Sequence, residues 1–168
     1  MLTGDIRSKV DALWNAFWSG GIANPIEIIE QVTYLLFLKR LDDLETLEES
    51  KSARLKQPMA RRIFPEGADA RGRATSDMRW SRFKHFAPSE MFIVVSEHVF
   101  PFLRSMGGDG STYAHHMKDA RFTIPTPALL AIVKTKKTEL LFLALFLRLL
   151  KPGGRAAVIV PDGVLLCC

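Results

Sequence analysis

Apolar residues recur at helical spacing near the N-terminus of the chain. Thr3 is a suitable helix N-cap, and Ser19-Gly20-Gly21 ends the pattern because glycine accepts the left-handed conformation of a helix C-terminus. The apolar stripe between them consists of Ile6, Val10, Leu13, Trp14 and Phe17.

Asn24-Pro25 predicts the start of a second helix, since asparagine caps and proline fits the first turn. The stripe of this helix consists of Ile26, Ile29, Val32, Leu36 and Leu41, and it is widened by Ile28, Leu35 and Leu38.

The breadth of this second stripe predicts a helix that is buried on more than one side. Its acidic end, Asp42–Glu49, is expected to face water. Glu45, Glu48 and Glu49 are expected near the helix C-terminus, where the helix dipole disfavours carboxylates. The basic residues that follow within reach, and that can offset this effect, are Lys51, Arg54 and Lys56.

Residues 57–90 are punctuated by proline and glycine, which predicts a loop. Several apolar side chains are expected to pin this loop onto the helices; they are Ile63, Phe64, Trp80, Phe83 and Phe86. A third helix is expected from Ser89, as its cap, to Arg104, with Pro101 bending or ending it. Its apolar face consists of Phe92, Val95, Val99 and Leu103. Gly107–Gly110 is expected to form a break, followed by a short helix over about 112–120 and an extended segment over 121–127.

The C-terminal part of the chain has a different pattern. Thr138 can cap a helix over 139–150, which Lys151-Pro152-Gly153-Gly154 stops, and residues 155–160 form a continuous apolar strand. A helix followed by such a strand is typical of the buried parallel sheet of an α/β domain. Large apolar side chains surround the helix on nearly every side, so this unit must be buried against the N-terminal helices or against a second copy of the chain. We favour a homodimer formed through residues 139–160.

Composition and charge narrow the function classes. The chain has 168 residues and a net charge of +5, and its only cysteines, Cys167 and Cys168, are adjacent and make no disulfide framework. Residues 51–90 carry ten basic and four acidic side chains, which permits contacts with phosphates; the alternative is a solvated loop. No secretory signal is visible and no apolar run is long enough to span a bilayer, so a cytoplasmic protein is expected, with no membrane partner.

Several blocks of the sequence resemble one family. Residues 34–43 (YLLFLKRLDD) resemble a signature of the N-terminal helical domain of one family, the modification subunit of type I restriction-modification systems. Members of this family are DNA adenine-N6 methyltransferases. Leu13-Trp14, Arg79-Trp80-Ser81 and Asp119–Phe122 match further blocks of that family in order. The resemblance implies that the chain contacts DNA, a specificity subunit and a second modification subunit.

The tail resembles a later part of the same family, within its methyltransferase domain. The matching segments are Lys136–Phe142, Leu150–Arg155 and Val160–Leu165. In the family a long segment separates the two regions, whereas here they join near Ala131-Ile132. We therefore divide the chain into an N-terminal helical domain, residues 1–131, and a remnant of the methyltransferase domain, residues 132–168, with the catalytic core between them deleted.

The family's cofactor and catalytic strings do not occur in this sequence. The family binds S-adenosylmethionine with a glycine-rich loop, Asp-Pro-x-x-Gly-x-Gly/Ala-Gly, and holds the flipped adenine with Asn-Pro-Pro-Phe/Tyr. Gly107–Gly110 follows a helix rather than a strand and is interpreted as a turn, and Asn24-Pro25 is interpreted as a helix cap. His115 and His116 are adjacent and point about 100° apart on a helix, which argues against a metal site. We therefore assign no catalytic, cofactor-binding or metal residue and expect no bound cofactor.

The sequence thus predicts a mainly α protein: an N-terminal helical bundle followed by a C-terminal helix-strand remnant of an α/β methyltransferase sheet. The function expected from the resemblance is that of a truncated, catalytically inactive modification subunit that keeps surfaces for other subunits and for DNA. Two alternatives stay open, an active methyltransferase and an unrelated helical protein-protein interaction module.

Overall fold

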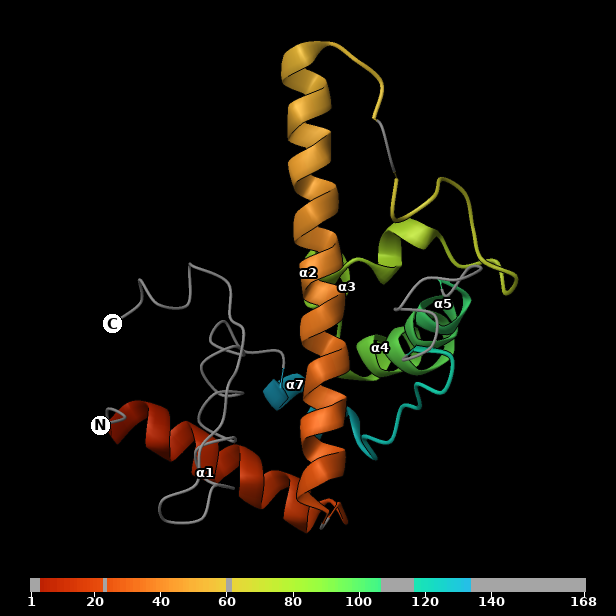
Figure 1. Ribbon diagram of the computed structural model, residues 1–168. Coiled ribbons are helices and arrows are strands. Elements are labelled where there is room, and N and C mark those ends of the chain that lie inside the picture. Colours follow the sequence, from red (N-terminus) through yellow and green to blue (C-terminus); the bar gives the residue numbers. More distant parts are fainter. Residues whose placement is uncertain (1–3, 23, 60–61, 107–116, 134–168) are drawn as a thin grey trace. The chain divides into compact units, whose positions relative to one another are not determined.

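The structure is a computed structural model that describes residues 4–22, 24–59, 62–106 and 117–133 (Figure 1). The chain divides into two compact units, one of Met1–Leu36 with Ile124–Cys168 and one of Phe37–Thr123. The regular elements of the described residues are helices, apart from a single antiparallel bridge between Ala68 and Ala74. The predicted mainly α class is therefore confirmed for this part of the chain. None of the helices described there is both long enough and apolar enough to cross a bilayer.

The first unit is organised around a helix terminus that the sequence predicts. Helix α1 spans Gly4–Ser19, and Gly21 follows it with a φ of 91°. The N–H of Ile22 donates to the carbonyl of Phe17 at 3.0 Å, and that of Gly21 donates to Trp18 at 3.1 Å, which is the Schellman pattern of a helix end. Phe17 and Ile22 are both buried, as the apolar contact that accompanies this motif requires.

Helix α2, Pro25–Leu55, begins where the sequence predicts and contributes its first turns to this unit. The side chain of Asn24 accepts the N–H of Ile26 at 3.0 Å, so the predicted cap is confirmed. Ile26 itself is 74% exposed, whereas Ile28 and Val32 are buried, so the expected stripe was wrong at its first residue.

A helix that the sequence analysis missed completes the first unit. Helix α7, Pro127–Val133, lies where an extended segment was expected to end. Thr126 caps it, because its hydroxyl oxygen accepts the N–H of Leu129 at 3.3 Å. The Thr126-Pro127 pair is the same cap-and-proline signal as Asn24-Pro25. Gly20 faces α7 closely enough that a β-carbon there would lie 3.3 Å from Leu129 Cδ2, so a larger residue would disturb the contact between α1 and α7.

The second unit packs short helices around the later part of α2. The chain turns back after Leu55 and descends beside α2, and it then forms a 3-10 helix, Thr75–Met78, and helix α3, Trp80–Phe83 (Figure 1). Of the five expected apolar pins, Phe64, Trp80 and Phe83 are buried and Ile63 and Phe86 are half-buried, so the prediction that this loop-like region is fixed to the core is confirmed most clearly for the first three. Phe64 stacks on Phe102, with ring centroids 5.3 Å apart.

The third expected helix is present, but its middle part is π-helical rather than α-helical. It consists of α4, Pro88–Ile93, a π-helical segment, Val94–Val99, and α5, Phe100–Ser105. Pro101 neither ends it nor leaves it regular: proline lacks an N–H and crowds the preceding turn, and the wider π turn lies directly before it. The expected cap at Ser89 was wrong, because Pro88 takes the first helical position and Ala87, which has no capping side chain, precedes it.

Several expectations fall on residues outside the described ranges. These are the Thr3 cap, most of the short helix over about 112–120, the Gly107–Gly110 turn, and the tail helix and strand over 139–160. They stay predictions, as does the domain boundary at 131–132.

Candidate functional site

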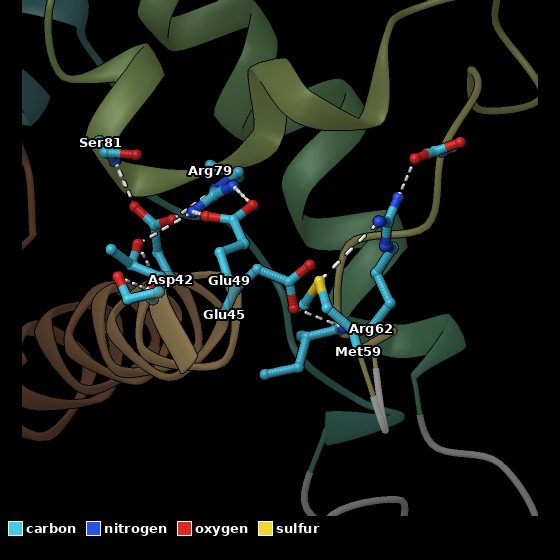
Figure 2. Close-up of polar contacts among 11 residues, drawn as sticks. Asp42, Glu45, Glu49, Met59, Arg62, Arg79 and Ser81 are labelled. Atoms are coloured by element: carbon cyan, nitrogen blue, oxygen red, sulfur yellow. Dashed lines mark hydrogen bonds and ion pairs between the residues drawn. The ribbon is translucent and has the colours of Figure 1, made fainter. Parts of the chain in front are cut away.

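The half-buried side chain of Arg79 is the centre of a network of charged hydrogen bonds in the second unit. Its Nε donates to Asp42 Oδ1 at 2.6 Å, and its Nη1 donates to Glu49 Oε1 at 2.6 Å. Its Nη2 donates to Thr46 Oγ1 at 2.9 Å and to Glu49 Oε2 at 3.1 Å. The other oxygen of Asp42 accepts the backbone N–H of Ser81 at 2.6 Å (Figure 2). We call these five residues, Asp42, Thr46, Glu49, Arg79 and Ser81, the Arg79 cluster.

Two local features of the chain bring this cluster together: the spacing of three residues on α2 and the extended residue before α3. Asp42, Thr46 and Glu49 lie at positions i, i+4 and i+7 of α2 and therefore share one face. Arg79 is the extended residue between the 3-10 helix and α3, which directs its side chain away from both and onto that face. Because Arg79 itself supplies no side-chain cap for α3, Asp42 serves as a cap from another helix by accepting the N–H of Ser81.

The electrostatics keep the Arg79 guanidinium charged. The hydrogen bond with Glu49, supported by that with Asp42, raises the pKa of Arg79 above its ordinary value, although burial acts in the opposite direction. Asp42 is only 3% exposed, so its charge depends on this guanidinium for compensation. The cluster therefore ties the loop and α3 to α2.

The expectation that the acidic stretch 42–49 faces water is confirmed for Asp43 and Glu49, which are exposed, but was wrong for two other carboxylates. Asp42 and Glu45 are buried, because the returning chain covers their face of α2. Helix α2 also continues beyond Glu49 to Leu55. Glu45 Oε2 accepts the N–H of Ile63 at 2.7 Å. Glu48 pairs with Lys51 at 3.5 Å, so one of the expected basic offsets is confirmed.

A second polar cluster holds the loop that precedes the 3-10 helix. Asp69 Oδ2 lies 2.6 Å from Nδ1 of the buried His98, and its Oδ1 accepts the N–H groups of Arg71 and Arg73. The hydrogen bond with His98 lowers the pKa of Asp69 below its ordinary value, while burial opposes this shift. Arg73 pairs with Glu90 at 2.8 Å, and Arg71 with Glu97 at 2.8 Å, so the same loop is bound to the third helix at three points.

A hollow of about 350 Å³ lies between α2 and the returning loop. Its charged and aromatic lining consists of Glu45, Glu49, Arg62, Phe64, Glu66 and Arg79. It borders the Arg79 cluster, and Figure 2 shows Glu45 projecting from α2 beside Glu49. The lining is mainly polar, unlike the apolar pockets that hold most cofactors.

The pairing of these polar groups was not predicted from the sequence, although Glu45, Glu49 and the Arg79-Trp80-Ser81 block were noted there. The usable signal was the spacing of Asp42, Glu45 and Glu49 on the face that continues the buried Leu38 and Leu41. Within the described ranges no three His, Cys, Asp or Glu side chains are placed to hold a metal ion. The residues discussed from the sequence as weak candidates, Gly107–Gly110, His115, His116, Cys167 and Cys168, lie outside those ranges.

Of the blocks that carry the family resemblance, 79–81, 119–122 and most of 34–43 lie in the second unit, whereas Leu13-Trp14 lies on α1 in the first unit. The end of the block 34–43 supplies Asp42, and the block 79–81 supplies both of its hydrogen-bond donors. In the block 119–122, Phe122 packs against Phe92 and Phe100, with centroids 5.3 and 5.2 Å apart, and the carbonyl of Ala120 accepts Arg104 Nη1 at 2.9 Å. These blocks therefore act as fold-forming contacts.

Comparison with known proteins gives one family. A protein-family model described as the HsdM N-terminal domain matches residues 6–136. Searches of curated proteins and of solved structures found no match. The family match excludes the alternative of an unrelated helical module. The chain therefore belongs to the HsdM N-terminal domain family, the N-terminal region of the modification subunit of type I restriction-modification systems.

Proposed function

We propose that this chain is a non-catalytic interaction module of a type I restriction-modification assembly. One observation carries the proposal: two of the family's sequence blocks contact each other through Asp42, Arg79 and Ser81, and a third packs against the third helix. The charged groups of these blocks are hydrogen-bonded to one another, so they stabilise the fold of a docking domain and take no part in methyl transfer. The partners that family membership supports are a specificity subunit and a second modification subunit.

The tail belongs to the same proposal. Residues 132–168 resemble a fragment of the methyltransferase domain from which the glycine-rich loop and the Asn-Pro-Pro string are missing. Self-association through residues 139–160 and a cytoplasmic location stay predictions. Light scattering of the intact chain and of a chain ending at Ala131 would test self-association, because only the intact chain should form dimers.

The chain is expected not to bind S-adenosylmethionine. The physical reason is that cofactor affinity in this family depends on a glycine-rich loop that brings backbone N–H groups close to the ligand, and this sequence has no such loop. Isothermal calorimetry should detect no binding, with a full-length modification subunit as the positive control. A dissociation constant below about 100 μM, which corresponds to roughly −5.5 kcal/mol, would contradict the non-catalytic assignment.

Binding to DNA by the basic region is expected to be weak and indifferent to sequence. Among the ten basic side chains of residues 51–90, the structure pairs five with carboxylates: Lys51, Arg62, Arg71, Arg73 and Arg79. Among the described residues, Arg54, Lys56 and Arg82 have no ion-pair partner, so few cations are available for phosphates.

Fluorescence anisotropy with two unrelated duplexes measures this binding. Replacing Arg54, Lys56 and Arg82 with glutamine should reduce the dependence of log affinity on log salt by about 2–3, since each phosphate contact contributes about 0.9. The single variant Arg71→Gln is the control and should change the slope little, because Arg71 is paired with Glu97. A footprint on one defined sequence at physiological salt would overturn the expectation.

A further inference from the structure

The later turns of α2 present an apolar face that lies away from the contacts with the returning chain. Leu47 and Leu55 on this face are 59% and 56% exposed, and the half-buried Leu44 belongs to the same face. The face lies roughly 120° around the helix from the residues that hydrogen-bond to the returning chain, which are Asp42, Glu45 and Glu49. The Arg79 cluster and its neighbours therefore leave this side of α2 open.

Four residues form the centre of this face, at positions i, i+4, i+7 and i+11 of α2. They are Leu44, Glu48, Lys51 and Leu55, and we call them the outer stripe of α2. At about 100° per residue these positions fall within roughly 60° of one another around the helix. The outer stripe is therefore nearly straight and runs along about three helical turns.

The order of residues along the outer stripe is self-complementary. From its N-terminal end the stripe is apolar, acidic, basic and apolar, and from its C-terminal end it is apolar, basic, acidic and apolar. Two copies laid antiparallel about the midpoint of the stripe place Leu44 opposite Leu55 and Glu48 opposite Lys51, each twice. Two parallel copies would place each charge opposite the same charge, which is unfavourable.

We propose that the outer stripe of α2 pairs with the outer stripe of a second copy of this chain, with the two helices antiparallel. Complementary charges at facing positions select both the partner and the orientation of a helix pair. Glu48 and Lys51 already form an ion pair within the chain at 3.5 Å, and their side chains are 35% and 56% exposed. A carboxylate accepts and an ammonium donates several hydrogen bonds, so each side chain can also reach its partner on the second copy.

The short length of the outer stripe sets the strength of this pairing. A contact of about three helical turns is smaller than a stable interface, so we expect a dissociation constant of about 0.1–1 mM. A chain ending at Ala131 therefore stays monomeric at the micromolar concentrations at which the association of the tails is measured. The pairing is inferred from one helix alone and does not depend on the proposed function.

Disulfide cross-linking tests the pairing and its orientation. The full chain is used with Cys167 and Cys168 replaced by serine, and a Leu44→Cys chain is mixed with a mass-tagged Leu55→Cys chain at about 200 μM under mild oxidation. Facing positions of an antiparallel pair bring the two sulfur atoms within bonding range, so disulfides between unlike chains should exceed those between like chains by about tenfold. Ala53→Cys is the control, since Ala53 is exposed on the opposite side of α2, and mixed with the Leu44→Cys chain it should form about tenfold fewer disulfides.

Charge reversal in the same cross-linking chains tests the complementarity. Glu48→Lys places like charges opposite each other twice, so it should lower the yield of unlike-chain disulfides about tenfold. Adding Lys51→Glu to it restores the opposite charges and should restore the yield, while circular dichroism checks that helicity is unchanged.

Three results would overturn the inference. One is a statistical mixture of like-chain and unlike-chain disulfides, and another is a yield that Glu48→Lys leaves unchanged in a folded chain. The third is an absence of these disulfides together with weaker binding of the specificity subunit by the Glu48→Lys chain, which would give the outer stripe to that subunit. The cross-linking uses this chain alone, so its failure is distinguishable from a failure to join the type I assembly.

Discussion

Replacing Asp42 with alanine is expected to lower the free energy of unfolding by about 3 kcal/mol. The substitution leaves the Ser81 N–H without its acceptor and removes the buried charge that compensates Arg79. Breaking a buried ion pair costs about 3–5 kcal/mol, and the lower value applies because Arg79 keeps its contacts with Glu49 and Thr46. Such a loss is a large fraction of the 5–15 kcal/mol that typically stabilises a whole domain. Urea unfolding followed by circular dichroism measures it.

The neighbouring Asp43 supplies the matched control. It has the same side chain on the same helix, but it is exposed, so Asp43→Ala should change the free energy of unfolding by less than about 0.5 kcal/mol. Asp42→Asn should fall between the two, because asparagine can still accept the N–H of Ser81 while its charge is lost. Equal stabilities of the Asp42→Ala and Asp43→Ala chains would show that the Arg79 cluster does not hold the second unit together.

The sequence is sufficient to predict the elements whose ends carry local signals. Gly21 ends α1 and Asn24 caps α2, because each acts through its own backbone geometry or a hydrogen bond within two residues. The burial of Phe64 and Phe83 is predictable for a related reason. A polar loop has no core of its own, so a large aromatic side chain in it packs against the helices.

The features that the sequence analysis missed depend on distant partners. Asp42 and Glu45 were predicted to lie on a solvent-exposed acidic face, because nothing near them in the sequence indicates their contacts with Arg79 and Ile63. The end of α2 is also poorly marked, because Lys56, with a φ of 52°, takes the left-handed position that glycine usually occupies. The helix α7 is a different case, because its Thr126-Pro127 cap was visible in the sequence but was taken as part of an extended segment.

The largest effect expected of this chain is the formation of a complex with a specificity subunit. If the family blocks maintain a docking domain, the chain should bind a type I specificity subunit without any contribution from methyl transfer or its cofactor. The affinity should be tighter than about 1 μM, or roughly −8 kcal/mol, as a stable subunit interface requires. The Asp43→Ala chain should bind equally well, whereas the Asp42→Ala chain should lose binding in proportion to the fraction that is unfolded.

Native mass spectrometry of the chain mixed with the specificity subunit of its own type I system tests the central claim most directly. At about 10 μM of each protein the account predicts a stoichiometric complex, formed with or without S-adenosylmethionine. A folded chain that stays free, in a sample where a full-length modification subunit binds the same specificity subunit, would contradict it.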